Sequence, residues 1–553
     1  MKKDLIISYS ILTLGVVLSV VLSFIGLRYN VDSIYDEGFL FLSQRSACAG
    51  TINGMSLGPN IIAATLGDAC CGTIFNLRLV GLIVELLSAV IFFLLTYNLF
   101  CSGRSQTIGY LIICLLFVVP SLGGLVVCAN ELAKLFLCTT TALGIRVLLT
   151  DNLRWNTVCC ILIGVFGMLG IFCILPSAVL LLACLFILLL IKNWKQWTII
   201  TKYVLFVLFG FGMGLLIVHC FVADLSLVFH EMAEVATTVT TLQRGYDPLS
   251  FLTKFLLFVR DWALCCIVIL GCVFISDKIS GFATKWIANI FLIVILLIYV
   301  KYQIKPQITT PMVMSVMWLI LLYNKSKEYV KINVLNFDTW LNLFLIFSPV
   351  ILSIGTNTYL GGKMAHFMLP WAILLCRLGW NKDNVPLRMI VSVFVVVLLS
   401  YHSLPNTIAS INSQTYEVKQ GILKNMHLTE QQKKHFDLCD SIMAQYNFQP
   451  AKSVVYSTQL GMMTVCYLGG VNCANYFQPM DFVSNARRDN LLCPDFIFIN
   501  DYDITVSGDA MREIGWGWPN EFDVYDVGTP ETIDVGYPTT RNLYCRKSLK
   551  KND

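Results

Sequence analysis

The sequence predicts a polytopic α-helical membrane protein of about 13 transmembrane helices with a small C-terminal α/β domain. Of its 553 residues, 57% are hydrophobic and only 13% are charged, whereas soluble domains carry about 25% charged residues. The mean hydropathy is +0.72. A chain this apolar needs lipid as its solvent, which excludes a soluble enzyme and a disordered protein. The net charge of +5 is too small for a nucleic-acid-binding protein, which needs a concentrated basic face.

The predicted spans follow from apolar runs, because a spanning helix needs about 20 consecutive apolar residues. Pro176 is the main divider between two adjoining spans in the middle of the chain. The runs lie at residues 5–27, 77–100, 107–129, 131–150, 157–174, 176–191, 198–222, 251–275, 286–302, 311–324, 339–355, 364–380 and 387–404.

The basic residues predict the orientation. Lys2 and Lys3 favour a cytoplasmic N-terminus, and the first run lacks the A-x-A site of a removed signal peptide. Alternating from there, the odd span count puts the C-terminal tail outside, as in a bacterial inner membrane protein with a periplasmic domain. Nearly every basic cluster then falls in a cytoplasmic loop: Arg104, Arg154, Lys192, Lys195, Lys278, Lys285, Lys325, Lys327, Lys331, Arg377, Lys382 and Arg388.

The charge divides the chain into two predicted modules, a transmembrane module over 1–404 and a soluble α/β domain over 405–553. The second holds 13 Lys and Arg against 17 Asp and Glu, which leaves 26 against 17 in the first. A basic, apolar front part is therefore joined to a mildly acidic tail, which is long enough to form one small domain.

The tail alternates helix-like and strand-like segments, which favours a small doubly wound sheet. Its cysteines form no CxxC or zinc pattern and are expected to be mostly free. The Trp516-Gly517-Trp518-Pro519 cluster is expected to pack in the domain. Helices are predicted over 416–446 and 459–468, and strands over 452–457, 495–500, 522–527 and 542–546.

An acidic pair follows the first span, in Tyr35-Asp36-Glu37-Gly38. It lies in an outer loop, 28–76, that is too long for a simple connection and in which surface helices are predicted. Acidic residues at this position can cap a surface helix, where the helix dipole favours them. Charged groups close to the bilayer also commonly serve a function, and both interpretations stand at this point.

This arrangement resembles the GT-C superfamily of integral-membrane glycosyltransferases, which includes protein O-mannosyltransferases and the lipid A aminoarabinose transferase. Its members have an N-terminal span, an outer loop opening with an acidic pair, about 11–13 spans and often an extracytoplasmic C-terminal domain. The Tyr-Asp-Glu start and the apolar-aromatic segment after it carry the likeness in detail.

The resemblance implies an inverting transfer of a sugar from a polyprenyl-phosphate donor to a lipid, glycan or protein acceptor. Asp36 would be the base that takes the acceptor's proton, and Glu37 would assist or bind a divalent metal. No cofactor is certain. Tyr35 is a candidate acceptor contact. Because the leaving group is a phosphate, the site also needs cations on the outer face.

The segment 353–366, which joins two late spans, offers such cations. Gly355, Gly361 and Gly362 would let backbone N–H groups approach an anion. Lys363 and His366 would share one helix face at the start of the next span, where the helix dipole favours phosphate. A solvated lysine and a packed core histidine are the alternative.

Other outer residues are further candidates for binding the substrates. Lys301 and Lys305 could contact the donor, or could simply extend to the interface. Arg244 is a third candidate for the phosphate, and Glu231 for the acceptor. Asn130, Glu131 and Lys134 lie at an outer turn, where an interfacial ion pair is expected, although they could reach the same cavity.

Two other functions are compatible with many spans. A transporter or flippase for a lipid-linked glycan should show charges inside its spans and broken helices in two matching halves. An O-antigen-type polymerase or ligase also has large outer loops, but it does not account for an acidic pair directly after the first span. The glycosyltransferase is the leading hypothesis because the unexplained charges gather in loops on one face.

Overall fold

The computed structural model divides into two compact units, which are described separately. The first comprises Met1–Ser23, Ile83–Gly123 and Ala129–Pro405, and the second Phe24–Leu82, Gly124–Cys128 and Asn406–Asp553. The structure describes residues 2–29, 58–66, 72–119, 129–230, 233, 248–278, 310–315, 317–318, 336–355, 360–377, 407–449, 452–457, 471–472, 482–483, 491–528 and 541–551.

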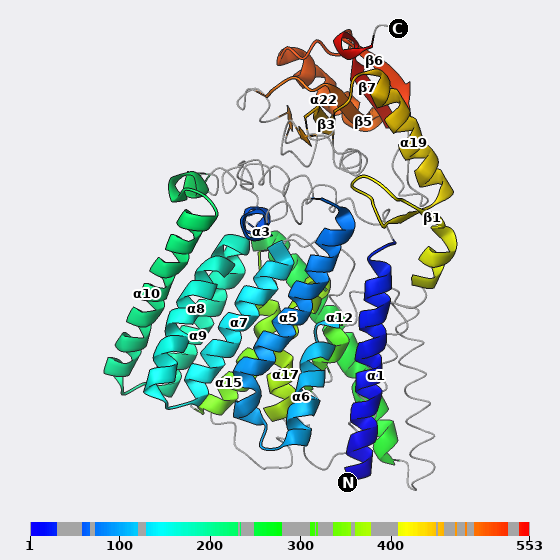
Figure 1. The fold of residues 1–553 in the computed structure, drawn as a ribbon. Helices are drawn as coiled ribbons and strands as arrows, with labels where there is room; N and C mark the ends of the chain where they lie inside the picture. Colours follow the sequence, from blue (N-terminus) through cyan, green and yellow to red (C-terminus); the bar gives the residue numbers. More distant parts are fainter. Residues whose placement is uncertain are drawn as a thin grey trace. The chain divides into compact units, whose positions relative to one another are not determined.

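The first unit is a bundle of apolar helices (Figure 1). Within the described residues, five helices are long and apolar enough to cross a membrane: α5 (Ile74–Phe100), most of α7 (Ala129–Leu149), α8 (Leu153–Cys173), α9 (Leu175–Lys192) and α10 (Trp197–Phe221). These agree with five predicted spans. Further helices of this unit are α1 (Lys2–Gly26), α6 (Arg104–Leu116), α12 (Pro248–Lys278) and α15 (Phe337–Leu352). Helix α3 (Gly58–Leu66) belongs to the second unit.

Two predicted spans are wrong in extent. The span 107–129 ends early, because α6 stops at Leu116 and Pro120 follows, and proline disfavours helix in the residue before it. The span 364–380 is not one helix. It is broken into α16 (Leu360–Met364), the 3₁₀ turn η4 (Ala365–Phe367) and α17 (Pro370–Arg377). Spans 286–302 and 387–404 lie outside the described residues, so the count of about 13 stays a prediction.

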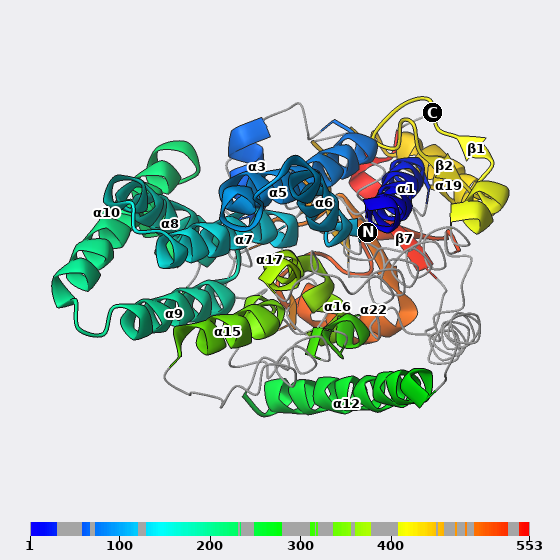
Figure 2. The same ribbon diagram turned by 90° about the horizontal axis from the view of Figure 1, so that it is seen from below.

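Helix α8 lies between α7 and α10 (Figure 2), and glycines allow the close approach to α10. A Cβ on Gly210 would lie 2.0 Å from the carbonyl oxygen of Ile161, and one on Gly164 would lie 2.1 Å from that of Val207. A Cβ on Gly212 would meet nothing within 4 Å. Small residues at such a crossing let two backbones touch, as they do in membrane helix pairs.

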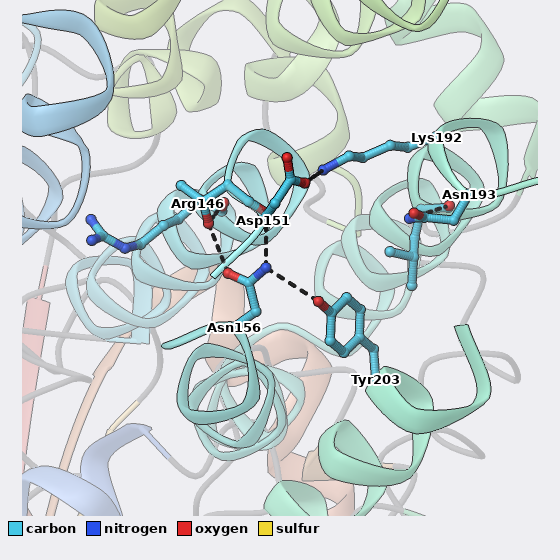
Figure 3. A network of polar contacts seen from close by, with 8 residues as sticks. Arg146, Asp151, Asn156, Lys192, Asn193 and Tyr203 are labelled. Carbon is cyan, nitrogen blue, oxygen red and sulfur yellow. Dashed lines mark hydrogen bonds and ion pairs between the residues drawn. The ribbon is translucent and has the colours of Figure 1, made fainter. Parts of the chain in front are cut away.

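A polar network joins the ends of α7, α8, α9 and α10 (Figure 3). Asn156 is buried, and its side-chain amide donates to the Thr150 carbonyl over 2.9 Å and to the Tyr203 hydroxyl over 3.2 Å. Lys192 pairs with the exposed Asp151 at 3.2 Å. This end of the bundle therefore carries Lys192, one of the basic residues that are predicted to face the cytoplasm.

The second unit contains a hairpin where a helix was predicted. Strands β1 (Tyr416–Glu417) and β2 (His427–Leu428) pair antiparallel, and the turn between them places Gly421 and Asn425 at positive φ. Helix α19 (Glu430–Gln445) begins only after its N-cap residue Thr429, which forms a capping box with Gln432. The predicted helix 416–446 is therefore wrong in its first half, where the capping signal was missed.

A five-stranded sheet follows α19. Its strands are β3 (Val454–Ser457), β4 (Val471–Asn472), β5 (Phe496–Asn500), β6 (Phe522–Asp526) and β7 (Arg541–Arg546), with α22 (Asp501–Glu513) after β5. The four predicted strands form as β3, β5, β6 and β7, and β4 adds a fifth strand that was not predicted. The order in the sheet is β4-β3-β5-β7-β6. However, β7 runs antiparallel to both β5 and β6, so the sheet is mixed rather than purely parallel and doubly wound. The predicted helix 459–468 lies outside the described residues.

Aromatic side chains form the core of this sheet. Trp516 is 1% exposed and lies against Tyr456 and Phe482, and the Trp518 ring lies 4.4 Å from that of Tyr544. The expectation that this tryptophan cluster packs in the domain is confirmed. Cys439, Cys493 and Cys545 in the tail form no disulfide.

Candidate functional site

A cluster of charged and polar side chains, some buried and some half-buried, lies in the first unit where α5, α7 and the α16–η4 segment meet. Glu85 comes from α5, Glu131 and Lys134 come from the first turns of α7, Lys363 comes from α16, and His366 comes from η4. The cluster thus joins three segments that are far apart in the sequence. The predicted pair, Lys363 and His366, is one side of it.

Lys134 and Glu85 form an ion pair inside the bundle. Their side chains are 0% and 3% exposed, and each lies within a helix that is long and apolar enough to cross a membrane. Taking two charges out of water costs several kcal/mol per ion, which only close pairing and further hydrogen bonds offset. Ionisable groups at membrane depth are rare for this reason and mark functional sites by default.

Lys363 reaches the beginning of α7, where its ammonium donates to the side-chain oxygen of Asn130. The sequence predicts an interfacial ion pair at the outer turn that holds Asn130, Glu131 and Lys134, although these residues could reach a cavity. The structure instead brings them to the same cluster as Lys363 and pairs Lys134 with Glu85 on another helix. Glu85 was missed, although a single glutamate inside a long apolar run is itself a signal.

His366 lies against the carboxylates. Single ligand atoms of Glu85, Glu131 and His366 all lie within 4.8 Å of one another. The Nδ1 atom of His366 is buried and has no hydrogen-bond partner among the described residues. Contrary to the prediction, Lys363 and His366 do not lie on one continuous α-helix. Lys363 is in α16, which ends at Met364, and His366 is in the 3₁₀ turn that follows.

Two carboxylates and an imidazole are a ligand set that divalent cations accept. Lys134 nevertheless pairs with Glu85 and supplies the positive charge that a metal would bring. A cation placed among the three would stand beside an ammonium and would have to displace it. The Lys134–Glu85 ion pair, rather than the donor set, therefore disfavours a resident metal at this cluster.

An anion has a better partner in Lys363. The ammonium contacts a neutral amide in Asn130, and exchanging that contact for a phosphate oxygen costs less than breaking the buried Lys134–Glu85 pair.

Gly355, which was predicted to let backbone N–H groups approach an anion, instead has a packing role. It has a φ of 90°, and a Cβ there would lie 2.7 Å from the ring of Pro176. The neighbouring Ser177 hydroxyl donates to the Ile354 carbonyl over 2.5 Å.

The remaining predicted site residues lie outside the described residues, so their roles stay predictions. They include the acidic pair with its preceding tyrosine, and the other proposed donor and acceptor contacts: Tyr35, Asp36, Glu37, Glu231, Arg244, Lys301 and Lys305.

Comparisons with known proteins give fold similarity alone. No protein-family model and no curated protein matches the chain. ArnT from Cupriavidus metallidurans bound to undecaprenyl phosphate aligns with 98% of this chain and 99% of its own, at 10% identity and a TM-score of 0.44. An oligosaccharyltransferase from Archaeoglobus fulgidus, in complex with zinc and sulfate, aligns with 92% of this chain and 70% of its own, at 10% identity and a TM-score of 0.42.

Proposed function

We propose that this chain is a membrane glycosyltransferase that moves a sugar from a polyprenyl-phosphate donor to a lipid, glycan or protein acceptor on the extracytoplasmic face. The observation that carries the proposal is the cluster around the buried Lys134 and the half-buried Lys363. It lies at the end of α7 that is predicted to face outward, and the positive-inside rule gives no reason for charges there.

The chemistry follows from the donor. The acceptor oxygen or nitrogen attacks the anomeric carbon, the bond from that carbon to the phosphate oxygen breaks, and polyprenyl phosphate leaves with the electron pair. Asp36 takes the acceptor's proton. Lys363 stabilises the charge that grows on the phosphate, with Arg244, Lys301 and Lys305 as further cations. Glu231 and Tyr35 orient the acceptor, and any divalent metal would bind at Glu37.

The full architecture belongs to the proposal as well. About 13 spans would place the N-terminus in the cytoplasm and the tail outside, in a bacterial inner membrane. Support for this orientation comes from the end of the bundle opposite to the cluster. There Lys192 is the last residue of α9, and basic residues at the ends of spans are enriched on the cytoplasmic side.

The test replaces Asp36 by Asn and measures sugar transfer from polyprenyl-phosphate donors in membranes holding the full chain. Asp32→Asn, in the same loop, is the matched control because it removes the same charge four residues away. We expect Asp36→Asn to lower transfer by about 10²-fold or more and Asp32→Asn to leave it within about twofold. Equal transfer by the wild type and Asp36→Asn would remove Asp36 as the base.

A transporter or flippase is the second candidate, and one observation favours it. Glu85 lies inside α5, a helix of 27 residues, and its pairing with Lys134 is a charge pair within the apolar bundle, as expected of a transporter. Failure of the wild type to transfer sugar from any donor, combined with movement of a fluorescent lipid-linked glycan across vesicles, would favour this second function.

A further inference from the structure

The basic residues of α8, α9 and α10 all lie at one end of these three helices. Residues 155–191 and 203–221, which form the rest of the helices and the turn between α8 and α9, contain no Lys, Arg, Asp or Glu. We call the four cations the basic end: Arg154 near the start of α8, Lys192 at the end of α9, Lys195 in the connection that follows, and Lys202 in the second turn of α10.

Two polar contacts hold the three helix ends together (Figure 3). The Lys192 ammonium pairs with Asp151, just before α8, at 3.2 Å. The Asn156 side-chain amide in α8 donates to the hydroxyl of Tyr203 in α10 over 3.2 Å. Arg154 lies between Asp151 and Asn156 in the chain, and Lys202 directly precedes Tyr203. The cations of the basic end therefore belong to one surface.

This surface has an excess of positive charge. Asp151 is the only Asp or Glu between residues 150 and 203, against the four cations, and it already pairs with Lys192. On α15, which packs against α9, Asp338 pairs with Arg377 at 2.8 Å. The other three cations of the basic end are exposed: Arg154, Lys195 and Lys202.

Exposed tryptophans place these cations at the level of lipid headgroups. Trp155, Trp194 and Trp197 are 60%, 67% and 60% exposed, and the last two rings have centroids 6.4 Å apart. Tryptophans at the ends of apolar helices gather at the membrane–water interface. Trp155 directly follows Arg154 in the chain, and Trp194 directly precedes Lys195. Both cations therefore lie where lipid phosphates lie.

We propose that the basic end binds the headgroups of anionic phospholipids in the leaflet that it faces, which the predicted orientation makes the cytoplasmic one. Ammonium and guanidinium groups form charge-assisted hydrogen bonds with phosphate oxygens. The positive-inside rule concerns only which side a cation occupies. An excess of exposed cations at headgroup level additionally favours a lipid with net negative charge over a zwitterionic one. The proposal does not depend on sugar transfer.

The size of the preference follows from the number of cations. Each Lys or Arg near an anionic membrane surface strengthens binding about fivefold. Three exposed cations that act partly together therefore predict a preference of about 10- to 100-fold for an anionic lipid. Salt screens such contacts, because the Debye length falls from about 10 Å at 0.1 M to about 3 Å at 1 M.

The experiment measures lipid binding to the full chain in a neutral detergent by native mass spectrometry. The probes are phosphatidylglycerol, which carries one net negative charge, and phosphatidylcholine with the same acyl chains, which carries none. The test variant is Arg154→Gln/Lys195→Gln/Lys202→Gln. The matched control, Lys419→Gln/Lys424→Gln/Lys452→Gln, removes three exposed cations from the tail and changes the net charge equally.

We expect the wild type and the tail control to prefer phosphatidylglycerol by at least about 10-fold at low salt, and the test variant by no more than about twofold. The wild-type preference should weaken as salt rises. The double variant Arg154→Gln/Lys195→Gln keeps the test informative if the triple variant does not fold, and it should lose most of the preference.

Three results would overturn the proposal. They are a wild type without preference, a folded test variant with the wild-type preference, and a tail control that loses as much as the test variant, which would make the effect one of net charge alone. None of these results bears on the proposed function, because the binding measurement involves no sugar donor. Conversely, a wild type that transfers no sugar would leave the lipid preference unchanged.

Discussion

The buried pair of Lys134 and Glu85 gives the sharpest prediction about the bundle. Lys134→Met removes an ammonium that is 0% exposed and leaves behind a carboxylate that is 3% exposed. Breaking a buried pair in this way costs about 3–5 kcal/mol, because the remaining charge stays buried without its counter-ion. The double variant Glu85→Gln/Lys134→Met removes both charges and should recover most of that loss.

The bundle contains a matched control. Lys192 and Asp151 also form an ion pair, at 3.2 Å, but their side chains are 25% and 96% exposed. A solvent-exposed pair contributes about 0–1 kcal/mol, so Lys192→Met should hardly change stability. The assay is thermal and denaturant unfolding of the full chain in a mild detergent. Equal stability of Lys134→Met and Lys192→Met would refute the reasoning, as would a double variant no better than Lys134→Met.

The same variants separate structure from function. If the pair only holds the bundle, the double variant should regain transfer along with stability. If the cluster serves the lipid phosphate, the double variant should be folded but at least about 10-fold slower, because an electrostatic contribution to the transition state is missing. We expect the second outcome. A stable double variant with wild-type transfer would move the site away from Lys134.

Three further predictions concern single side chains. Gly210→Ala should destabilise the α8–α10 crossing by about 1–3 kcal/mol, since backbone atoms cannot yield to the new Cβ, whereas Gly212→Ala should be neutral in the same unfolding assay. The Tyr446 hydroxyl donates to Asp523 over 2.5 Å and lowers the pKa of that carboxyl. The stability that the ionised Asp523 contributes is therefore fully present above the carboxyl's unfolded-state pKa, near 4, and is lost as pH falls through its lowered folded-state pKa. The difference in melting temperature between the wild type and Asp523→Asn should shrink from pH 6 to pH 3. Lys363→Met should weaken polyprenyl-phosphate binding by about 10-fold in a direct binding measurement.

The apolar helices could be predicted from the sequence, and the physical reason is local. A run of about 20 apolar residues has one stable form in lipid, so α5, α7, α8, α9 and α10 agree with their runs. The wrong helix predictions occur where the chain turns or breaks inside a segment whose residues have helical or apolar spacing. The segment before Thr429 has helical spacing but turns at Gly421 and Asn425, and Pro370 begins a new helix inside one apolar run.

The site was predictable only in part, because its pairing is not local. Lys363 and His366 stood out as polar residues in a glycine-rich segment between spans. Glu85 did not, since its partner Lys134 is 49 residues away on another helix. Spacing along one helix indicates which residues share a face, but it cannot indicate which face meets another helix. That information is present only in the packed bundle.

Helix α7 shows how burial separates two kinds of charge within one element. Arg146, in its last turn, donates to the Leu95 carbonyl and to Asn98, both over 2.9 Å, at an end of the bundle where water can reach. Lys134 lies twelve residues earlier, about 18 Å along the helix, and is fully buried. A charge that only sets orientation needs to sit in an interface, where it costs little. A charge that is buried at a cost of several kcal/mol needs another reason to be there, and an anionic group held at that depth provides one.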